Sequence, residues 1–245
     1  MYDSKYCYPN TNVLINKLNI RDSKELFERE KKLTFIRLQE LQYKPIEGKY
    51  DFKHLKAIHK YIFQDIYEWA GQERTVEIGK GNLFCPMINI REYADVVFAK
   101  YFPQCYESKN NKDKFIEMLA KNYGDLNALH PFREGNGRAQ REFARLVCNK
   151  CGYDFVLSYT THKQMLQASK LSFDYADNSL FINIFKKAVT LYDANLDVGK
   201  LKILSSDDLR ITMEDSDYGY NESKDTGIYT KIYKEKIESM KLNIK

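Results

Sequence analysis

The chain has 245 residues, of which 43% are hydrophobic and 30% are charged, and this balance excludes fibrous, collagen-like and wholly disordered proteins. Five prolines and eleven glycines fall below average usage, which favours long helices over a turn-rich β-sandwich or barrel. No apolar run reaches the roughly 20 residues that a membrane span needs. The formal net charge is +5, but acidic residues crowd segment 205–227, so we expect no continuous basic face and no nucleic-acid partner.

The five cysteines are odd in number and scattered, and the chain opens without an apolar signal segment. We therefore expect a reducing, cytoplasmic environment. Cys148 and Cys151 have the spacing of a redox or zinc pair, yet the sequence holds no second pair to complete a zinc site. Helix-end thiols are the better interpretation of these two residues.

Three segments in the first half of the chain have the apolar spacing of helices. Asp22 predicts the N-cap of a helix that Pro45 stops. Asp51 predicts the cap of a second helix, with Gly71 as its C-terminal breaker. Asn89 predicts the cap of a third helix, which continues to about residue 101.

The segment between the second and third helices alternates polar and apolar residues as strands do. Residues 75–78 and 83–85 flank turn chemistry at 79–82, which predicts an isolated two-stranded hairpin. Such a hairpin leaves its backbone edges unpaired. It is therefore either a packing element or a place where another chain docks by strand addition.

The second half of the chain again has helical spacing. An apolar stripe from Phe115 to Leu129 predicts a helix that ends at His130-Pro131, and segments 136–150, 161–173 and 178–192 also read as helices. Beyond residue 195 the apolar density falls. We expect one folded domain over 1–195 and an appendage over 196–245 that ends in a short helix, solvated rather than anchored in a membrane.

The candidate catalytic and binding residues lie together in the segment from His130 to Arg141. Pro131 prevents the preceding helix from continuing, so the imidazole of His130 can project into a cleft at a helix end. Gly135, Asn136 and Gly137 tolerate left-handed backbone angles. Their amides can form an anion-binding nest, and the positive end of the next helix reinforces it. The pattern predicts a phosphate site.

Charged side chains complete this predicted site. Arg138 and Arg141 share a helix face and can each grip phosphate oxygens with two hydrogen bonds. Glu134 supplies the hard oxygen that Mg²⁺ accepts beside phosphate, and His130 can take up a proton near neutral pH. Each feature alone is common in ordinary loops and solvated helices. Together they indicate transfer of a phosphate-linked group to a hydroxyl.

Residues 130–141 match every defined position of the Fic signature, His-x-Phe-x-Asp/Glu-Gly-Asn-Gly-Arg-x-x-Arg. The similarity extends to Tyr8-Pro9, to 66–71, to 74–76 and to Lys80-Gly81, and covers residues 6–192. The chain therefore resembles Fic proteins of the bacterial toxin type.

This resemblance implies an all-α Fic core with a β-hairpin flap, and transfer of AMP from ATP, with Mg²⁺, to a Tyr, Ser or Thr hydroxyl of a target protein. It implies that His130 is the catalytic base and that Glu134 binds Mg²⁺. It assigns the ATP phosphates to Gly135, Asn136, Gly137, Arg138 and Arg141, with Arg141 on the γ-phosphate. It assigns target docking to a flap formed by Gly79, Lys80, Gly81 and Asn82.

Many Fic proteins carry an inhibitory helix with the pattern Ser/Thr-x-x-x-Glu-Gly/Asn, and this sequence has no such pattern. Glu47-Gly48 comes closest, but Tyr43 stands where Ser or Thr is required. The resemblance therefore implies a separate antitoxin protein that supplies the inhibitory helix near Arg141. Alternatives remain: transfer of UMP, phosphocholine or phosphate, or a docking module without catalysis. Action in the cell's own cytoplasm and export into a host cell are both open.

Overall fold

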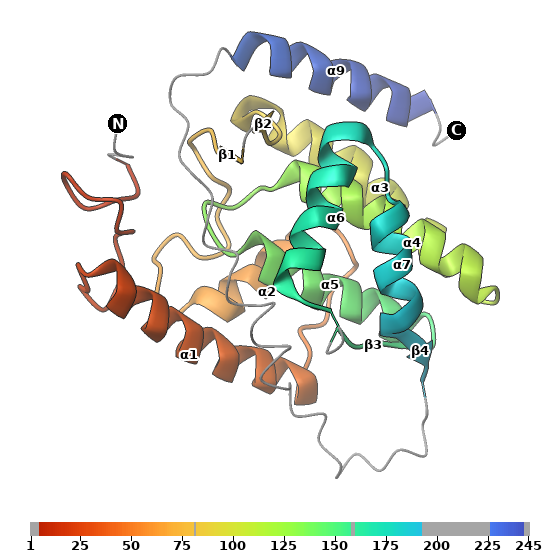
Figure 1. Cartoon of the computed structure of the whole chain (residues 1–245), viewed down its shortest axis with the longest axis horizontal. Coiled ribbons are helices and arrows are strands. Elements are labelled where there is room, and N and C mark those ends of the chain that lie inside the picture. The colour runs from red at the N-terminus through yellow and green to blue at the C-terminus, as the bar shows by residue number, and fades with distance from the viewer. Residues whose placement is uncertain (1–4, 81, 158–159, 193–225, 243–245) are drawn as a thin grey trace.

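The computed structural model describes residues 5–80, 82–157, 160–192 and 226–242. Helices form most of this part of the chain, and two small antiparallel sheets accompany them (Figure 1). The expectation of a helical core with a small hairpin is confirmed.

The first two helices begin where their caps were predicted. Helix α1 spans Ser23–Tyr43, and the Asp22 carboxylate accepts the Glu25 N–H at 2.8 Å. Helix α2 spans Phe52–Phe63 behind Asp51. The prediction that α2 extends to Gly71 was wrong, because the chain folds into successive turns after Phe63. Gly71 has a φ of 79° and passes so close to Lys60 that a Cβ would lie 2.7 Å from the Lys60 Cβ.

Helices α3 (Ile90–Glu107) and α4 (Lys112–Leu129) pack side by side. A short 3-10 turn, η1 (Met87–Asn89), precedes α3. Asn89 occupies the predicted N-cap of α3, but its side chain makes no capping hydrogen bond there. Helix α4 ends before His130 as predicted.

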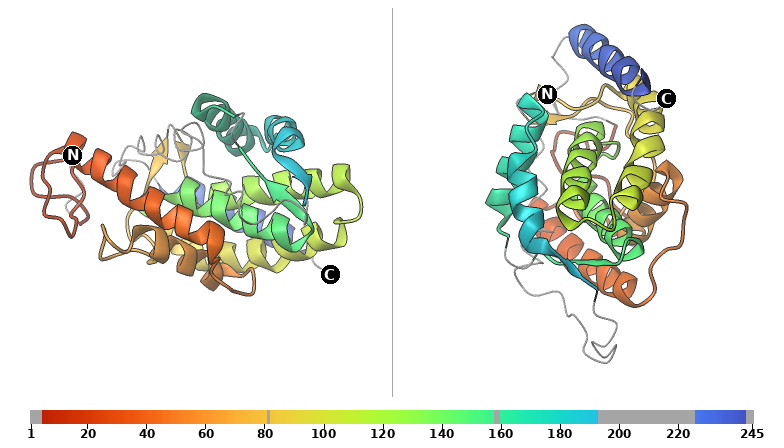
Figure 2. Two further views of the ribbon diagram at one scale, coloured as in Figure 1. Left: turned by 90° about the horizontal axis from the view of Figure 1, so that it is seen from below. Right: turned by 90° about the vertical axis from the view of Figure 1, so that its right-hand side faces the viewer.

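Helix α5 (Asn136–Lys150) is the central helix of the fold, and it contacts α2, α3 and α4 (Figure 2). Twelve of its fifteen residues are buried, including polar ones near its start. The protein therefore places the chemistry-bearing segment in its interior rather than on a solvated helix face.

The later elements follow the prediction except at their end. Helices α6 (His162–Tyr175) and α7 (Ser179–Ala188) lie where expected. The predicted helix to residue 192 stops at Ala188, because strand β4 (Val189–Leu191) pairs antiparallel with β3 (Tyr153–Phe155). Pairing with a distant strand overrode the helical spacing of these residues.

The predicted hairpin is present, but its strands are shorter than expected; the first begins later along the chain and the second begins one residue earlier. Strand β1 is Gly79–Lys80 and β2 is Asn82–Leu83, with Lys80 opposite Asn82. Gly79, Lys80 and Asn82 thus belong to strands although they were predicted as turn residues, and Leu83 lies in the second strand as predicted. Gly81 lies outside the described residues.

Helix α9 (Thr226–Leu242) packs against α3 and η1, at the top of Figure 1. The Asp125 carboxylate bonds Lys100 Nζ at 2.7 Å and Lys236 Nζ of α9 at 3.2 Å. Burial would raise the pKa of Asp125, but the two lysines outweigh it and hold this pKa below its usual value. A terminal helix is therefore present as predicted. The domain boundary at 195/196 lies outside the described residues and stays a prediction.

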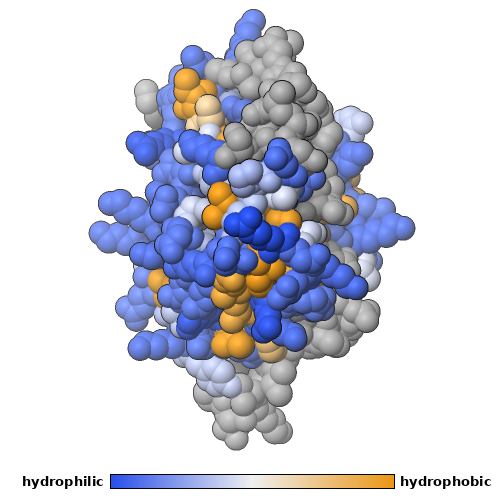
Figure 3. All heavy atoms as spheres, turned by 90° about the vertical axis from the view of Figure 1, so that its left-hand side faces the viewer, coloured by the Kyte–Doolittle hydropathy of each residue, from blue (hydrophilic) through white to orange (hydrophobic). Residues whose placement is uncertain are grey.

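On the face seen in Figure 3, the coloured residues are mostly hydrophilic, and apolar residues show in a central area and in a smaller group near the top. Among the described residues, no helix combines the length and apolar character needed to cross a bilayer.

Candidate functional site

The loop between α4 and α5 is shaped by its own backbone and by one asparagine. His130 caps α4 in the left-handed region, with φ 43°. The Asn136 side chain accepts the Phe132 N–H at 2.9 Å and donates to the Phe132 carbonyl at 2.8 Å. Gly135 has φ 79°, and a Cβ there would lie 2.0 Å from Phe63 Cζ. Only glycine fits this approach, so the loop is held tightly where α5 begins.

The imidazole of His130 is oriented by a hydrogen bond and a stacked ring. Its Nδ1 lies 3.0 Å from the Asn127 carbonyl oxygen, so Nδ1 is the nitrogen that carries the proton. In the neutral ring, Nε2 then holds the lone pair. The Phe84 ring stacks on the imidazole with centroids 3.7 Å apart. His130 is 0% exposed, so it lies beneath Phe84 rather than in the open cleft that the sequence suggested.

Arg74 joins the hairpin to the loop of His130. Its Nε donates to the His130 carbonyl at 2.9 Å, and its backbone N–H donates to the Pro131 carbonyl at 2.8 Å. Its Nη1 donates to the Val76 carbonyl, and its Nη2 to the Cys85 carbonyl. One buried guanidinium thus fixes the segments on both sides of the hairpin against the loop.

His59 of α2 contacts the same loop through a hydrogen bond and a stacked ring. Its Nε2–H donates to the Glu134 carbonyl at 2.9 Å, and its Nδ1 accepts the Gly71 N–H at 2.9 Å. Its ring stacks on Phe132 with centroids 3.8 Å apart. Burial is the main cause that lowers the pKa of His59 to about 3. The neutral imidazole is the form that both hydrogen bonds require.

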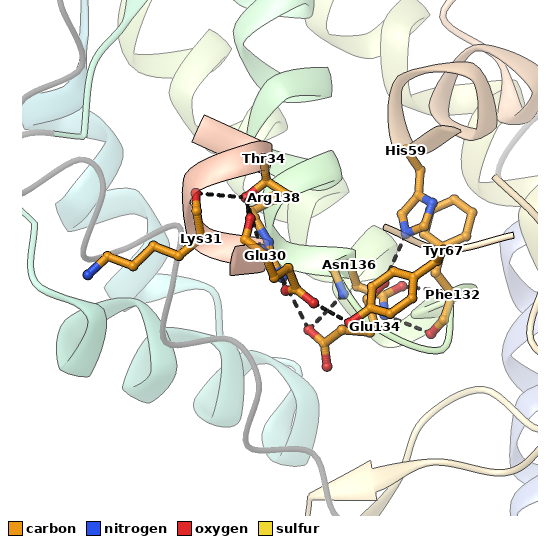
Figure 4. A network of polar contacts seen from close by, with 10 residues as sticks. Glu30, Lys31, Thr34, His59, Tyr67, Phe132, Glu134, Asn136 and Arg138 are labelled. Carbon is orange, nitrogen blue, oxygen red and sulfur yellow. Dashed lines mark hydrogen bonds and ion pairs between the residues drawn. The ribbon is translucent and has the colours of Figure 1, made fainter. Parts of the chain in front are cut away.

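Three charged side chains meet at the start of α5 (Figure 4). Glu134 Oε1 accepts the Gly135 N–H at 2.8 Å and lies 3.4 Å from Arg138 Nη2. The same Nη2 donates at 2.5 Å to Glu30 Oε1 of α1. The guanidinium also lies 4.5 Å above the Phe63 ring centroid. Arg138 is therefore a buried group held by α1 and α2.

The structure brings the residues predicted for phosphate and metal binding into one place. His130 and Glu134 lie on the loop, Gly135 is the N-cap of α5, and Asn136, Gly137, Arg138 and Arg141 form the first turns of this helix. Arg141 is buried, with 8% exposure. Of the predicted flap, Gly79, Lys80 and Asn82 form the hairpin, which reaches the loop through Phe84 stacked on His130.

The carboxylate at the start of α5 is compatible with Mg²⁺. No cluster of three or more His, Cys, Asp or Glu side chains able to hold a metal occurs in the part of the chain that the structure describes. Glu134 thus offers a single carboxylate at the start of α5, which suits Mg²⁺ that takes its other oxygens from phosphate and water. Cys148 and Cys151 are buried thiols whose pKa burial raises, that of Cys151 to about 11.

Several residues that shape the site were missed from the sequence: Glu30, His59, Tyr67, Arg74 and Phe84. For Glu30 a signal existed, because Glu30 and Thr34 interrupt the buried stripe of α1 formed by Leu26, Leu38 and Leu41. A buried carboxylate needs a partner. Tyr67 and Arg74 lie in segments 66–71 and 74–76, whose similarity to Fic proteins gave no role for the single residues, and His59 and Phe84 carry no comparable signal in their local sequence.

Comparison with known proteins gives concordant results. The family model of the Fic/DOC family matches residues 49–148. The protein adenylyltransferase VbhT of Bartonella schoenbuchensis is 35% identical over 191 residues, which are 78% of this chain and 40% of VbhT. The probable protein adenylyltransferase y4lH of Sinorhizobium fredii is 38% identical over 169 residues, which are 68% of this chain and 86% of that protein. The chain thus spans less than half the length of VbhT but most of y4lH.

Solved structures share the fold. The N-terminal Fic domain of a VirB-translocated Bep effector protein from Bartonella quintana, with bound ADP, has a TM-score of 0.69 and 26% identity, and the match covers 77% of this chain and 95% of that one. BepC of Bartonella tribocorum, with bound AMPPNP, has a TM-score of 0.68 and 23% identity, over 77% of this chain and 97% of that one.

Proposed function

Because this chain belongs to the Fic/DOC family, we propose that it is a protein adenylyltransferase, which transfers AMP from ATP to a Tyr, Ser or Thr hydroxyl of a target protein. Relatives named for this activity support the proposal. The observation that carries it is the geometry of His130, whose Nδ1 faces the Asn127 carbonyl at 3.0 Å. This contact leaves Nε2 as the basic nitrogen, and His130 lies on the loop that precedes the N-terminus of α5.

The first turn of α5 would bind the triphosphate. Its backbone N–H groups and positive helix end attract phosphate, and the close approach of Gly135 to Phe63 keeps this turn in place. Arg138 and Arg141 add positive charge from the same helix, with Arg141 assigned to the γ-phosphate. Glu134 would hold Mg²⁺, which when bound neutralises phosphate charge and orients the leaving group.

His130 would carry the proton transfer. Nε2 takes the proton of the target hydroxyl while that oxygen forms a bond to the α-phosphorus of ATP. The bond between the α-phosphorus and the oxygen bridging to the β-phosphate breaks, and pyrophosphate leaves. Phe84 stacks on the face of the imidazole, whereas Nε2 points outward in the ring plane. Because His130 is 0% exposed, the residues around it have to shift when a target side chain enters.

Labelled ATP tests this function. The purified chain is incubated with a lysate and with ATP labelled in either the α or the γ position. AMP transfer predicts protein labelling from the α position alone, and His130→Ala is expected to abolish it. Labelling from the γ position alone would show phosphate transfer instead. A biological effect that survives in His130→Ala without any labelling would favour a docking module.

Two partners follow from the proposed function. The target protein would align its backbone with the hairpin Gly79–Leu83, whose short strands are suited to strand addition. A small antitoxin would supply the inhibitory helix near Arg141, since the sequence lacks the Ser/Thr-x-x-x-Glu-Gly/Asn pattern. Strong labelling that no co-encoded small protein suppresses would contradict the antitoxin. The target lies in the protein's own cell or, if this chain is translocated as the VirB-translocated Bep effectors are, in a host cell.

A further inference from the structure

Glu30 has an unusual place for a carboxylate. It lies on α1, outside the family-matched segment 49–148, and is 7% exposed. One carboxylate oxygen accepts from Arg138, and the other accepts the hydroxyl of Tyr67 (Figure 4). Burial and Glu30 itself raise the pKa of Tyr67 well above its usual value, so this hydroxyl remains a donor. Glu30 is thus an oriented, buried carboxyl group.

Arg138 lies between two carboxylates. Its Nη2 is 2.5 Å from Glu30 Oε1 and 3.4 Å from Glu134 Oε1. All three side chains are at most 9% exposed, so water screens these charges only weakly. The Arg138 guanidinium therefore forms ion pairs with both carboxylates. The pair with Glu30 is the stronger one, because its distance is shorter.

We propose that Glu30 is a positioning residue that holds Arg138 away from Glu134, so that the Glu134 carboxylate stays available to a magnesium-bound nucleotide. This inference rests on the proposed function. Its physical basis is competition: a carboxylate in a close ion pair with arginine has less attraction left for a cation. Glu30 forms this close ion pair with Arg138 and is not itself a ligand of Mg²⁺.

Replacement of Glu30 by glutamine removes the charge and nearly preserves the shape. Arg138 would then turn toward Glu134, its neighbour at i,i−4. We expect the gain in nucleotide affinity on adding Mg²⁺ to fall by about tenfold or more, as when partners around metal ligands are changed. Affinity for nucleotide without metal should not fall, because the variant removes a negative charge beside the phosphates.

The measurement is calorimetric titration of the full chain with a non-hydrolysable ATP analogue, with and without Mg²⁺. The ratio of the two affinities reports the Mg²⁺ gain independently of catalysis. Glu28→Gln is the matched control, because Glu28 is an exposed carboxylate on the same helix, and it should leave the ratio unchanged. A purely structural role of Glu30 would weaken both affinities together.

The outcomes separate the two claims. A wild-type chain that binds no nucleotide under either condition would contradict the proposed function itself. A wild-type chain with a clear Mg²⁺ gain, matched by the same gain in Glu30→Gln, would overturn only the role of Glu30. If Glu30→Gln does not fold, Tyr67→Phe is the variant that tests the role of Glu30. It removes the hydroxyl that orients Glu30 and should lower the ratio in the same direction, and an unchanged ratio would refute the inference.

Discussion

Replacing His59 with phenylalanine tests whether the loop rests on an imidazole that must stay neutral. The Nδ1 of His59 accepts the Gly71 N–H, and its Nε2–H donates to the Glu134 carbonyl. A second ring proton would abolish the first of these bonds and place a charge beside Arg138. Phenylalanine keeps a ring between Phe63 and Phe132 but can make neither hydrogen bond.

The pH dependence follows from the pKa of His59, which burial lowers from 6.5 to about 3 in the folded protein. Below pH 6.5 the unfolded chain binds a proton at this residue that the folded chain does not. The contribution to stability is therefore complete above pH 6.5 and is lost progressively as the pH falls toward 3. Linkage makes the loss about 2 kcal/mol between pH 8 and pH 5.

The assay is urea denaturation of wild type and His59→Phe at both pH values. At pH 8 the variant should be less stable by about 2 kcal/mol, because two buried backbone groups lose their partners. At pH 5 this difference should nearly disappear. Leu55→Ala, a fully buried change on the same helix, is the control and should cost about 3 kcal/mol at both pH values. A constant difference between wild type and His59→Phe would refute the argument.

Three further changes test other parts of the structure. Gly135→Ala should lower the melting temperature more than Gly152→Ala does. Both glycines have positive φ, but only at Gly135 would a Cβ collide with Phe63. Equal decreases in melting temperature would contradict this close approach. Asp125→Asn should lower the free energy of unfolding by about 3 kcal/mol at pH 7, because it leaves buried lysine charge unpaired. Because the folded pKa of Asp125 is lowered, this difference should shrink as the pH falls below its ordinary 3.8; a constant difference in urea denaturation would contradict the ion pairs. The thiol of Cys148, whose pKa burial raises, should be alkylated at pH 8 only as the protein unfolds, and mass spectrometry showing faster labelling would contradict this burial.

The parts of the fold that the sequence predicted are those set by nearby residues. Asp22 and Asp51 cap their helices because a carboxylate reaches the N–H group three residues ahead. Pro131 ends α4 because it cannot continue the hydrogen-bond ladder. Gly135, Asn136 and Gly137 were predicted to tolerate left-handed angles; Gly135 adopts one, whereas Asn136 and Gly137 lie in the first turn of α5. In each case the controlling interaction lies within a few residues.

The parts that could not be predicted depend on partners far along the chain. The end of α7 is set by strand β3, whose Phe155 pairs with Val189. The position of Arg138 depends on Glu30, 108 residues away. The cover over His130 comes from Phe84, which follows the hairpin. Spacing within a segment carries no information about which distant side chain will be its neighbour.

These distant partners bear on where the site begins and ends. Segment 49–148 contains the loop, most of α5, Arg74 and His59, but it excludes all of α1. Without α1, Arg138 would keep Glu134 as a carboxylate neighbour and lose Glu30. A buried guanidinium that loses its nearer anion is drawn to the remaining one, which is the carboxylate assigned to Mg²⁺. If Glu30 has the proposed role, the unit that performs the proposed reaction is larger than segment 49–148 and includes α1.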